Sequence, residues 1–247
     1  GPDELAVLQP GFSPEIRGAV HYLCDAHTTP TQVIPKLRDY LLRAGVEIHP
    51  RTEVQGFSHT SNTLREVHTG KGVFPAEEVV LATGAWSPAL VRNLGLKLSL
   101  QAGKGYCIDI PRPTPIQLPA VLWEAKVAVT PMHGFTRLAG TMEFSGINHK
   151  IRKNRVTAIA RLTEAYYPGF SVAPGEEAGA TCGLRPVTPD GLPYIGRVSH
   201  WKNLSLATGH AMMGWSLGPV TGKMIAQIIS GKPTSMSLHA LHPERQF

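Results

Sequence analysis

The chain has 247 residues, 42% hydrophobic and 17% charged, and its 24 basic and 18 acidic side chains give a formal net charge of +6. This length allows one or two domains with a sizeable buried core. We interpret the scattered Lys and Arg residues as a mildly basic surface, with attraction to anionic ligands or a membrane surface as the alternative. Cys24, Cys107 and Cys182 form no CxxC pair. This argues against a disulfide framework or a zinc site and favours a reducing compartment.

Missing patterns exclude several function classes. The chain has no GxSxG, P-loop or heptad repeat, and its 11 histidines show no HxH or HxxxH ligand spacing. Its aromatic residues are too dispersed for a nucleic-acid platform. No apolar run approaches the roughly 18 residues of a membrane span, and no signal peptide opens the chain. We therefore expect a cytoplasmic protein that uses neither a metal ion nor nucleic acid.

The first third of the chain alternates between helical and extended patterns. Thr28–Thr31 predicts a helix start with a proline in the first turn, and apolar residues then recur at helical spacing until Gly45. The strands expected next are 45–49, 52–57, and a small ribbon of 64–69 with the region of Phe74.

An apolar run without alternation, Glu78–Gly84, follows the ribbon and predicts a strand that is buried on both faces. The run breaks at its glycine and leads into Ser87–Arg92, a capped helix start.

From residue 98 the pattern changes to short extended runs separated by Pro and Gly clusters. Strands at 105–110, 127–130 and 136–141 predict an antiparallel sheet, and 152–167 predicts an amphipathic helix. A later strand at 204–209 ends in a glycine, and Gly218-Pro219 is expected to open a helix that ends at Gly231.

Two kinds of pattern therefore interleave, and we predict a mixed α/β fold in which one domain is inserted into another. Residues 28–97 and 182–247 are α/β in character. Residues 98–181 read as an antiparallel sheet with a covering helix, and 1–27 is expected to pack there too.

The last quarter of the chain carries the densest set of backbone-shaping residues. After the strand ending at Gly209, a loop and a helix start offer free N–H groups that suit an anion; a plain strand-to-helix connection is the alternative. Arg185 is held extended by the following proline and can grip a carboxylate through two bonds, or it simply pairs with Asp190 in the Thr-Pro-Asp-Gly turn. His210 is either a general base or a hydrogen-bonded packing residue.

The same residues resemble a known family. Gly183-Leu-Arg-Pro-Val-Thr-Pro-Asp-Gly-Leu-Pro-Tyr-Ile-Gly196 and Asn203-Leu-Ser-Leu-Ala-Thr-Gly-His-Ala-Met-Met-Gly-Trp215 are similar to signatures of the FAD-dependent D-amino-acid oxidoreductases, which include glycine oxidase, sarcosine oxidase and D-amino-acid oxidase. Val80–Trp86 and Gly103–Tyr106 also match. The resemblance covers nearly the whole chain and favours the bacterial D-amino-acid dehydrogenase branch. It implies an incomplete FAD-binding Rossmann-like domain, into which an antiparallel-sheet substrate domain is inserted.

The resemblance implies a role for each matching residue. Arg185 would bind the substrate carboxylate, and Met142 and Tyr106 would line the substrate pocket. The residues expected to contact FAD are Val54, Thr83, Gly84, Trp86, Gly209, His210, Ala211, Met212, Met213, Gly214, Trp215 and Ser216. In such enzymes a hydride passes from the amino-acid Cα to the flavin, and the imine product hydrolyses to a 2-oxo acid and ammonia. No catalytic base from the protein is required.

Two departures from the family pattern qualify these expectations. Glycine oxidases have an arginine where Met212 stands and a tyrosine near Ala128, which favours a dehydrogenase here. The family's opening G-x-G-x-x-G motif has no counterpart in this chain, so we expect an N-terminal FAD-binding segment to be the missing partner and the isolated chain to bind FAD weakly.

The other partners implied are a D-amino acid and a quinone acceptor at the inner membrane surface. Alternative functions are a D-hydroxyproline dehydrogenase, a glycine or sarcosine oxidase, or an inactive fragment that serves only as a structural or partner-binding module.

Overall fold

The computed structural model describes residues 1–247, which form two compact units. Unit 1 comprises residues 1–48, 104–143 and 149–183, and unit 2 comprises 49–103, 144–148 and 184–247. The boundaries between the units at 103/104 and 183/184 lie close to the expected domain boundaries. The units differ from the expected domains chiefly at 28–48, which clusters with unit 1. The assignment of the units to FAD and to substrate remains a prediction.

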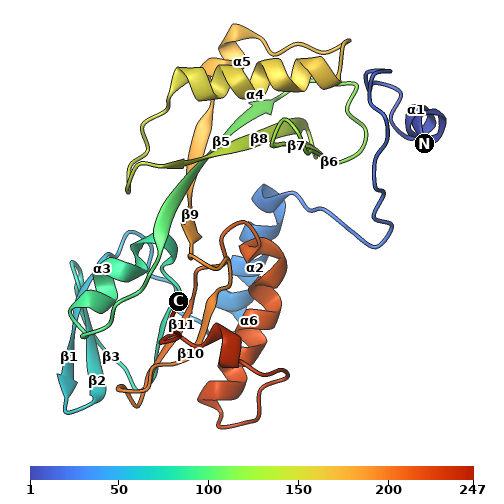
Figure 1. The fold of residues 1–247 in the computed structure, drawn as a ribbon. Helices are drawn as coiled ribbons and strands as arrows, with labels where there is room; N and C mark the ends of the chain where they lie inside the picture. The colour runs from blue at the N-terminus through green and yellow to red at the C-terminus, as the bar shows by residue number, and fades with distance from the viewer. The chain divides into compact units, whose positions relative to one another are not determined.

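The sheet that dominates unit 1 has the strand order β6-β7-β8-β5-β9, and β6, β7 and β8 pair antiparallel (Figure 1). Its strands are β5 (Gln101–Ile110), β6 (Ala120–Leu122), β7 (Val127–Met132), β8 (Phe135–Phe144) and β9 (Thr181–Val187). The expected antiparallel sheet is therefore present. β5, β8 and β9 extend beyond unit 1 at their ends, so each strand connects the two units through the chain.

Helix α4 (Lys153–Tyr166) covers the sheet of unit 1 (Figure 1). Val156, Ile159, Ala160 and Thr163 are its buried residues, at the spacing of one helix face. They join a core that includes Ile108, Val129 and Leu138 from the strands. The prediction of an amphipathic helix over 152–167 is confirmed.

The N-terminal part of unit 1 carries two further helices, α1 (Pro2–Leu8) and α2 (Pro30–Arg43). α2 begins after Thr29 with Pro30 in its first turn, and Gly45 follows it with a φ of +85°, so both predicted helix signals are confirmed. None of its residues is buried. Helix α5 (Pro174–Ala178) follows α4.

Unit 2 contains two small sheets. β1 (Val54–Thr60), β2 (Thr63–Thr69) and β3 (Gly72–Pro75) form the expected antiparallel ribbon. The other sheet has the order β10-β11-β4, in which β11 (Leu204–Thr208) pairs antiparallel with β10 (Tyr194–Arg197) and parallel with β4 (Val79–Leu81).

Short and long helices complete unit 2. A 3-10 turn, η1 (Gly84–Trp86), leads into α3 (Ser87–Arg92), and a second 3-10 turn, η2 (His239–Leu241), lies near the C-terminus. Helix α6 (Gly214–Ile229) packs against β10 and β11 through Met224 and Ile225.

Three local expectations are wrong. Residues 45–49 form no strand, because no neighbouring strand pairs with them. Val80 is 37% exposed, so β4 is not buried on both faces. Helix α6 begins at Gly214 and contains Pro219 in its second turn, so it does not open at Gly218-Pro219. No helix is both long and apolar enough to cross a membrane.

Candidate functional site

The parallel strands β4 and β11 bring two glycine-containing loops to one edge of the sheet in unit 2. Leu81, the last residue of β4, is in register with Leu206, so residues 82–84 leave the sheet beside the last residues of β11. Ligands of α/β folds bind at this carboxyl edge, where strands end and helices begin. The two segments that the sequence assigned to one site therefore meet at one edge.

A chain of hydroxyl groups joins these two loops. Thr83 Oγ1 lies 2.9 Å from Ser87 Oγ, which donates to Thr208 Oγ1 at 3.2 Å, and Thr208 in turn donates to the carbonyl of Gly84 at 3.3 Å. Ser87 and Thr208 are buried. Sequence reasoning missed both as site residues, although Thr208 directly precedes Gly209 and Ser87 lies three residues after Gly84. The chain fixes the two loops relative to each other.

The loop after β11 leaves no space for a larger side chain at its first residue. Gly209 has a φ of +83°, and an added Cβ would lie 2.8 Å from Thr188 Cγ2. Ala211 also has a left-handed backbone, with φ +48°, and its N–H donates to the carbonyl of Pro186 at 2.9 Å. Positive φ at a residue with a side chain is costly and marks functional loops. The loop is thus fixed by contacts with the 186–188 segment.

Helix α6 begins directly after this loop with an uncapped N-terminus. Met213 is its N-cap residue, no side chain caps the first turn, and no acidic residue lies in that turn. A helix start of this kind presents unbonded N–H groups and a partial positive charge, which favour an anion. Apolar side chains are exposed around both loops: Trp86, Met212, Met213 and Trp215.

His210 has the environment of a packing residue. Its Nε2 lies 2.9 Å from Thr221 Oγ1, and burial lowers the pKa of the imidazole below its usual 6.5. The neutral ring is favoured because the buried site penalises the charged form. This supports the hydrogen-bonded packing interpretation that the sequence left open.

Arg185 lies half-buried in β9, in the part of that strand that belongs to unit 2. Arg245 binds both oxygens of Asp190, at 2.9 and 3.0 Å, and whether Arg185 serves a substrate carboxylate or pairs with Asp190 stays a prediction. Pro186, the next residue, accepts the hydrogen bond from Ala211. Arg185 is therefore adjacent in β9 to the residue whose carbonyl holds the loop after β11.

The other expected site residues are more dispersed. Val54 is half-buried at the start of β1 in unit 2, and Met142 is half-buried in β8 of unit 1. Tyr106 is fully buried in unit 1, where its hydroxyl donates to Glu143 at 2.8 Å and its pKa is raised, mainly by burial and further by that carboxylate. The substrate contacts assigned to Met142 and Tyr106 remain predictions.

A buried ionic cluster in unit 1 was missed from the sequence. Glu143 receives Lys104 Nζ at 3.2 Å, and the Nε atoms of Arg152 and Arg155 each at 3.0 Å. Lys104 is 1% exposed and Glu143 5%. Lys104 also donates to the carbonyl of Lys150 at 3.0 Å. Three cations and the Tyr106 hydroxyl around one carboxylate link β5, β8 and the start of α4.

Comparison with known proteins agrees with this geometry. Residues 1–228 match the DAO family, described as FAD dependent oxidoreductase. D-amino acid dehydrogenase of Helicobacter pylori is 31% identical over 227 residues, which cover 91% of this chain and 54% of that protein. The enzyme of the same name from Neisseria gonorrhoeae strain NCCP11945 is 31% identical over 242 residues, covering 95% and 57%. The chain thus spans little more than half the length of these relatives.

Solved structures of two amino-acid oxidoreductases also resemble the chain. Glycine oxidase from Geobacillus kaustophilus superposes with a TM-score of 0.90 at 26% identity, covering 100% of this chain and 66% of that one. L-proline dehydrogenase from P. horikoshii superposes with a TM-score of 0.87 at 21% identity, covering 99% and 67%, which is a likeness of fold. The chain belongs to the DAO family of FAD-dependent oxidoreductases.

Proposed function

We propose that this chain supplies the flavin-ring and carboxylate-binding parts of a D-amino acid dehydrogenase that deaminates D-amino acids oxidatively. The observation that carries the proposal is the meeting of the Thr83–Trp86 and Gly209–Ser216 segments at the carboxyl edge of β4 and β11, beside the uncapped start of α6. The similarity to named D-amino acid dehydrogenases supports the choice of reaction.

The residues at this edge fit a flat cofactor that gains negative charge. Gly209 carries no side chain that would block backbone approach, and Ala211 holds the loop in a left-handed turn. The start of α6 would face the flavin ring, where its dipole and N–H groups stabilise negative charge. Thr83, Gly84 and Trp86 would lie along the dinucleotide. When bound, FAD accepts the hydride from the amino-acid Cα.

Arg185 would bind and orient the substrate. Its guanidinium can form two parallel bonds with a carboxylate, which fixes both the position and the rotation of the amino acid. Holding the Cα hydrogen at about 3–3.5 Å from its acceptor supplies most of the protein's contribution. Since the hydride leaves Cα directly for the flavin, no protein base is required, and His210 is assigned to packing through its contact with Thr221.

A second segment would complete the enzyme. The relatives are nearly twice as long as the stretch they share with this chain, and the shared stretch lacks a G-x-G-x-x-G motif. We propose that an additional FAD-binding segment cradles the pyrophosphate, and that without it the chain binds FAD weakly. We further propose a cytoplasmic enzyme that passes electrons to a quinone at the membrane surface.

The test is the variant Arg185→Ala in the flavin-loaded, full-length protein. The Michaelis constant for a D-amino acid should rise about 10- to 100-fold while flavin content stays constant, because a charge-assisted bidentate contact is lost. Arg197→Ala is the matched control, since Arg197 forms a similar two-bond pair with Glu78 at 2.8 and 3.1 Å within the same unit. An unchanged constant for Arg185→Ala removes this residue from the substrate site.

A glycine oxidase is the second candidate, because the glycine oxidase structure superposes over the whole chain. Turnover of D-alanine, D-proline, D-hydroxyproline, glycine and sarcosine separates the candidates. Turnover of D-alanine supports the proposal, whereas turnover of glycine and sarcosine alone would replace it.

A further inference from the structure

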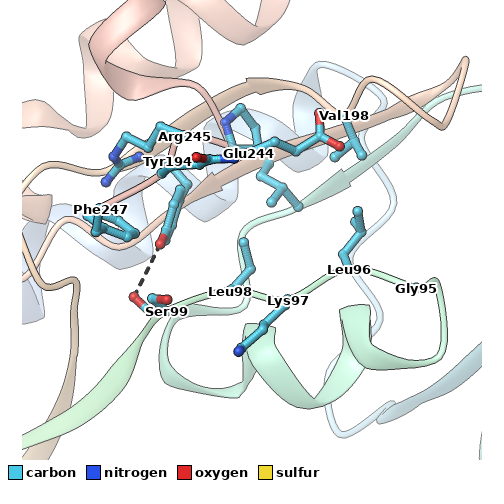
Figure 2. Close-up of a pocket in the computed structure, with 13 residues that line it drawn as sticks. Gly95, Leu96, Lys97, Leu98, Ser99, Tyr194, Val198, Glu244, Arg245 and Phe247 are labelled. Carbon is cyan, nitrogen blue, oxygen red and sulfur yellow. Dashed lines mark hydrogen bonds between the residues drawn. The ribbon is translucent and has the colours of Figure 1, made fainter.

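The C-terminal residues of the chain fasten onto the turn between β9 and β10, in unit 2. Residues 243–247 line a cavity of about 630 Å³ together with Tyr194 and the 95–99 segment (Figure 2). Arg245 dominates this contact. Its long cationic side chain is only 10% exposed, although the residue lies close to the C-terminus.

Arg245 directs most of its guanidinium bonds to one short segment, and one further N–H donates to the carbonyl of His242 at 3.3 Å. It binds both oxygens of Asp190, at 2.9 and 3.0 Å, and donates to the carbonyls of Leu192 at 2.6 Å and Pro193 at 3.1 Å. Its charged group also lies 4.1 Å from the centre of the Tyr194 ring. Figure 2 shows both side chains at this cavity. A planar fork with five donors can make this set of bonds, whereas the single ammonium of a lysine cannot.

The segment that Arg245 binds, residues 190–194, belongs to the turn that packs against the loop after β11. Thr188 donates from its hydroxyl to the carbonyl of Leu192 at 2.9 Å, which closes the turn. The methyl of Thr188 and the ring of Tyr194 enclose Gly209, with an added Cβ 2.8 and 3.3 Å from their nearest atoms. Residues on both sides of the Arg245 contact therefore touch the loop.

The backbone just before the turn also contacts the loop. Pro186 accepts the N–H of Ala211 at 2.9 Å, and it directly follows Arg185 in β9. The 186–194 segment thus connects three features. These are Arg185, which binds the substrate carboxylate in the proposed function, the left-handed loop 209–211, and the contact of Arg245 with residues 190–194, which we call the latch. Removing the latch leaves the turn with its internal bonds, from the Thr188 hydroxyl to Leu192, from the Leu192 N–H to Asp190 and from the Gly191 N–H to Thr188.

We propose that Arg245 is a positioning residue, which fixes the 186–194 turn and through it the 209–213 loop and the end of β9 that carries Arg185. Its importance for the reaction rests on the proposed function. Its effect on the loop does not, because every contact in the argument lies within unit 2 of this chain.

Hydrogen exchange of the purified 247-residue chain tests the structural part. In Arg245→Gln, the amide of Ala211 and the amides of Gly191 and Leu192 in the turn should exchange about tenfold faster or more, because several charge-assisted bonds are lost. In Arg197→Gln these amides should keep their rates, although that variant also loses a two-bond pair in unit 2. Arg245→Lys should resemble Arg245→Gln, since charge alone does not replace the fork.

Two outcomes would overturn the proposal. One is equal exchange at the Ala211 amide in both glutamine variants, and the other is a uniform increase throughout unit 2, which indicates general destabilisation. The flavin-loaded, full-length protein adds a separate measurement: Arg245→Gln should raise the Michaelis constant more than it lowers the turnover number. If the exchange result holds and Arg185→Ala has no effect on that constant, the latch stands and the proposed function fails.

Discussion

The variant Glu143→Ala should be among the most destabilising single substitutions in unit 1. It removes the carboxylate that pairs with Lys104, Arg152 and Arg155, and Lys104 is 1% exposed. Removing one partner of a buried ion pair costs about 3–5 kcal/mol, because the remaining charge has neither water nor a counter-ion. Most of this cost comes from Lys104. Arg152 and Arg155 are more exposed, at 60% and 36%, and can turn towards solvent.

The matched controls follow from the same geometry. Arg152→Ala should cost less than about 1 kcal/mol, because its partner keeps two other cations and its own side chain is exposed. Lys104→Met should cost less than Glu143→Ala, since the remaining carboxylate still binds two arginines. The double variant of Lys104 and Glu143 should cost less than the sum of the single ones.

The assay is urea unfolding followed by fluorine NMR of 5-fluorotryptophan. The chain has four tryptophans, and Trp123 is the one in unit 1, so its signal reports the free energy of that unit separately from unit 2. The reasoning is refuted if Glu143→Ala costs no more than Arg152→Ala, or if the Trp123 transition does not move.

Two further predictions concern single buried groups. Tyr167→Phe should leave the free energy of unfolding unchanged or raise it by up to about 1 kcal/mol, because the buried Tyr167 hydroxyl has no hydrogen-bond partner; urea unfolding checks this, with Tyr106→Phe as the control that loses a bond to Glu143 and should be destabilising. His210 should titrate below 6.5 in the folded chain, as measured by NMR of its ring protons, because burial disfavours the imidazolium.

The sign of the His210 effect on stability follows from linkage. The unfolded chain takes up the proton near pH 6.5, before the folded chain does, so the stabilising contribution is complete above that pH. It is lost as the pH falls towards the folded pKa. His210→Gln should flatten this part of the curve of unfolding free energy against pH. A variant with the same slope as the parent protein would contradict the assignment.

Sequence patterns predicted those elements whose signals are local. α4 follows from the apolar spacing of a helix face, and the start of α2 from Thr29 and Pro30. The beginning of α6 was misplaced, because Gly218-Pro219 is a typical helix start and the actual start, Gly214, has no capping side chain. The Gly45–His49 segment has strand-like residues, yet a strand needs a neighbour and none pairs there.

The residues of the candidate site also fall into those with a local sequence signal and those without one. The glycine loops and Arg185 stand out because their residue types are unusual for their positions. The Glu143 cluster and the Arg245 latch join residues 39 and 55 positions apart, Lys104 with Glu143 and Asp190 with Arg245. Each residue in these pairs is ordinary by itself. Their importance comes from burial and from partners that only the folded chain brings within bonding distance.

The hydroxyl chain between the β4 and β11 loops has a direction, and this determines what Thr83 can offer a ligand. The protons of Ser87 and Thr208 are committed to the next acceptor, Thr208 and Gly84 respectively. Thr83 must therefore give its own proton to Ser87 in the 2.9 Å contact. Its oxygen keeps lone pairs but has no proton to spare. Thr83 would thus accept a bond from a sugar hydroxyl, whereas a phosphate oxygen at this edge would depend on backbone N–H groups.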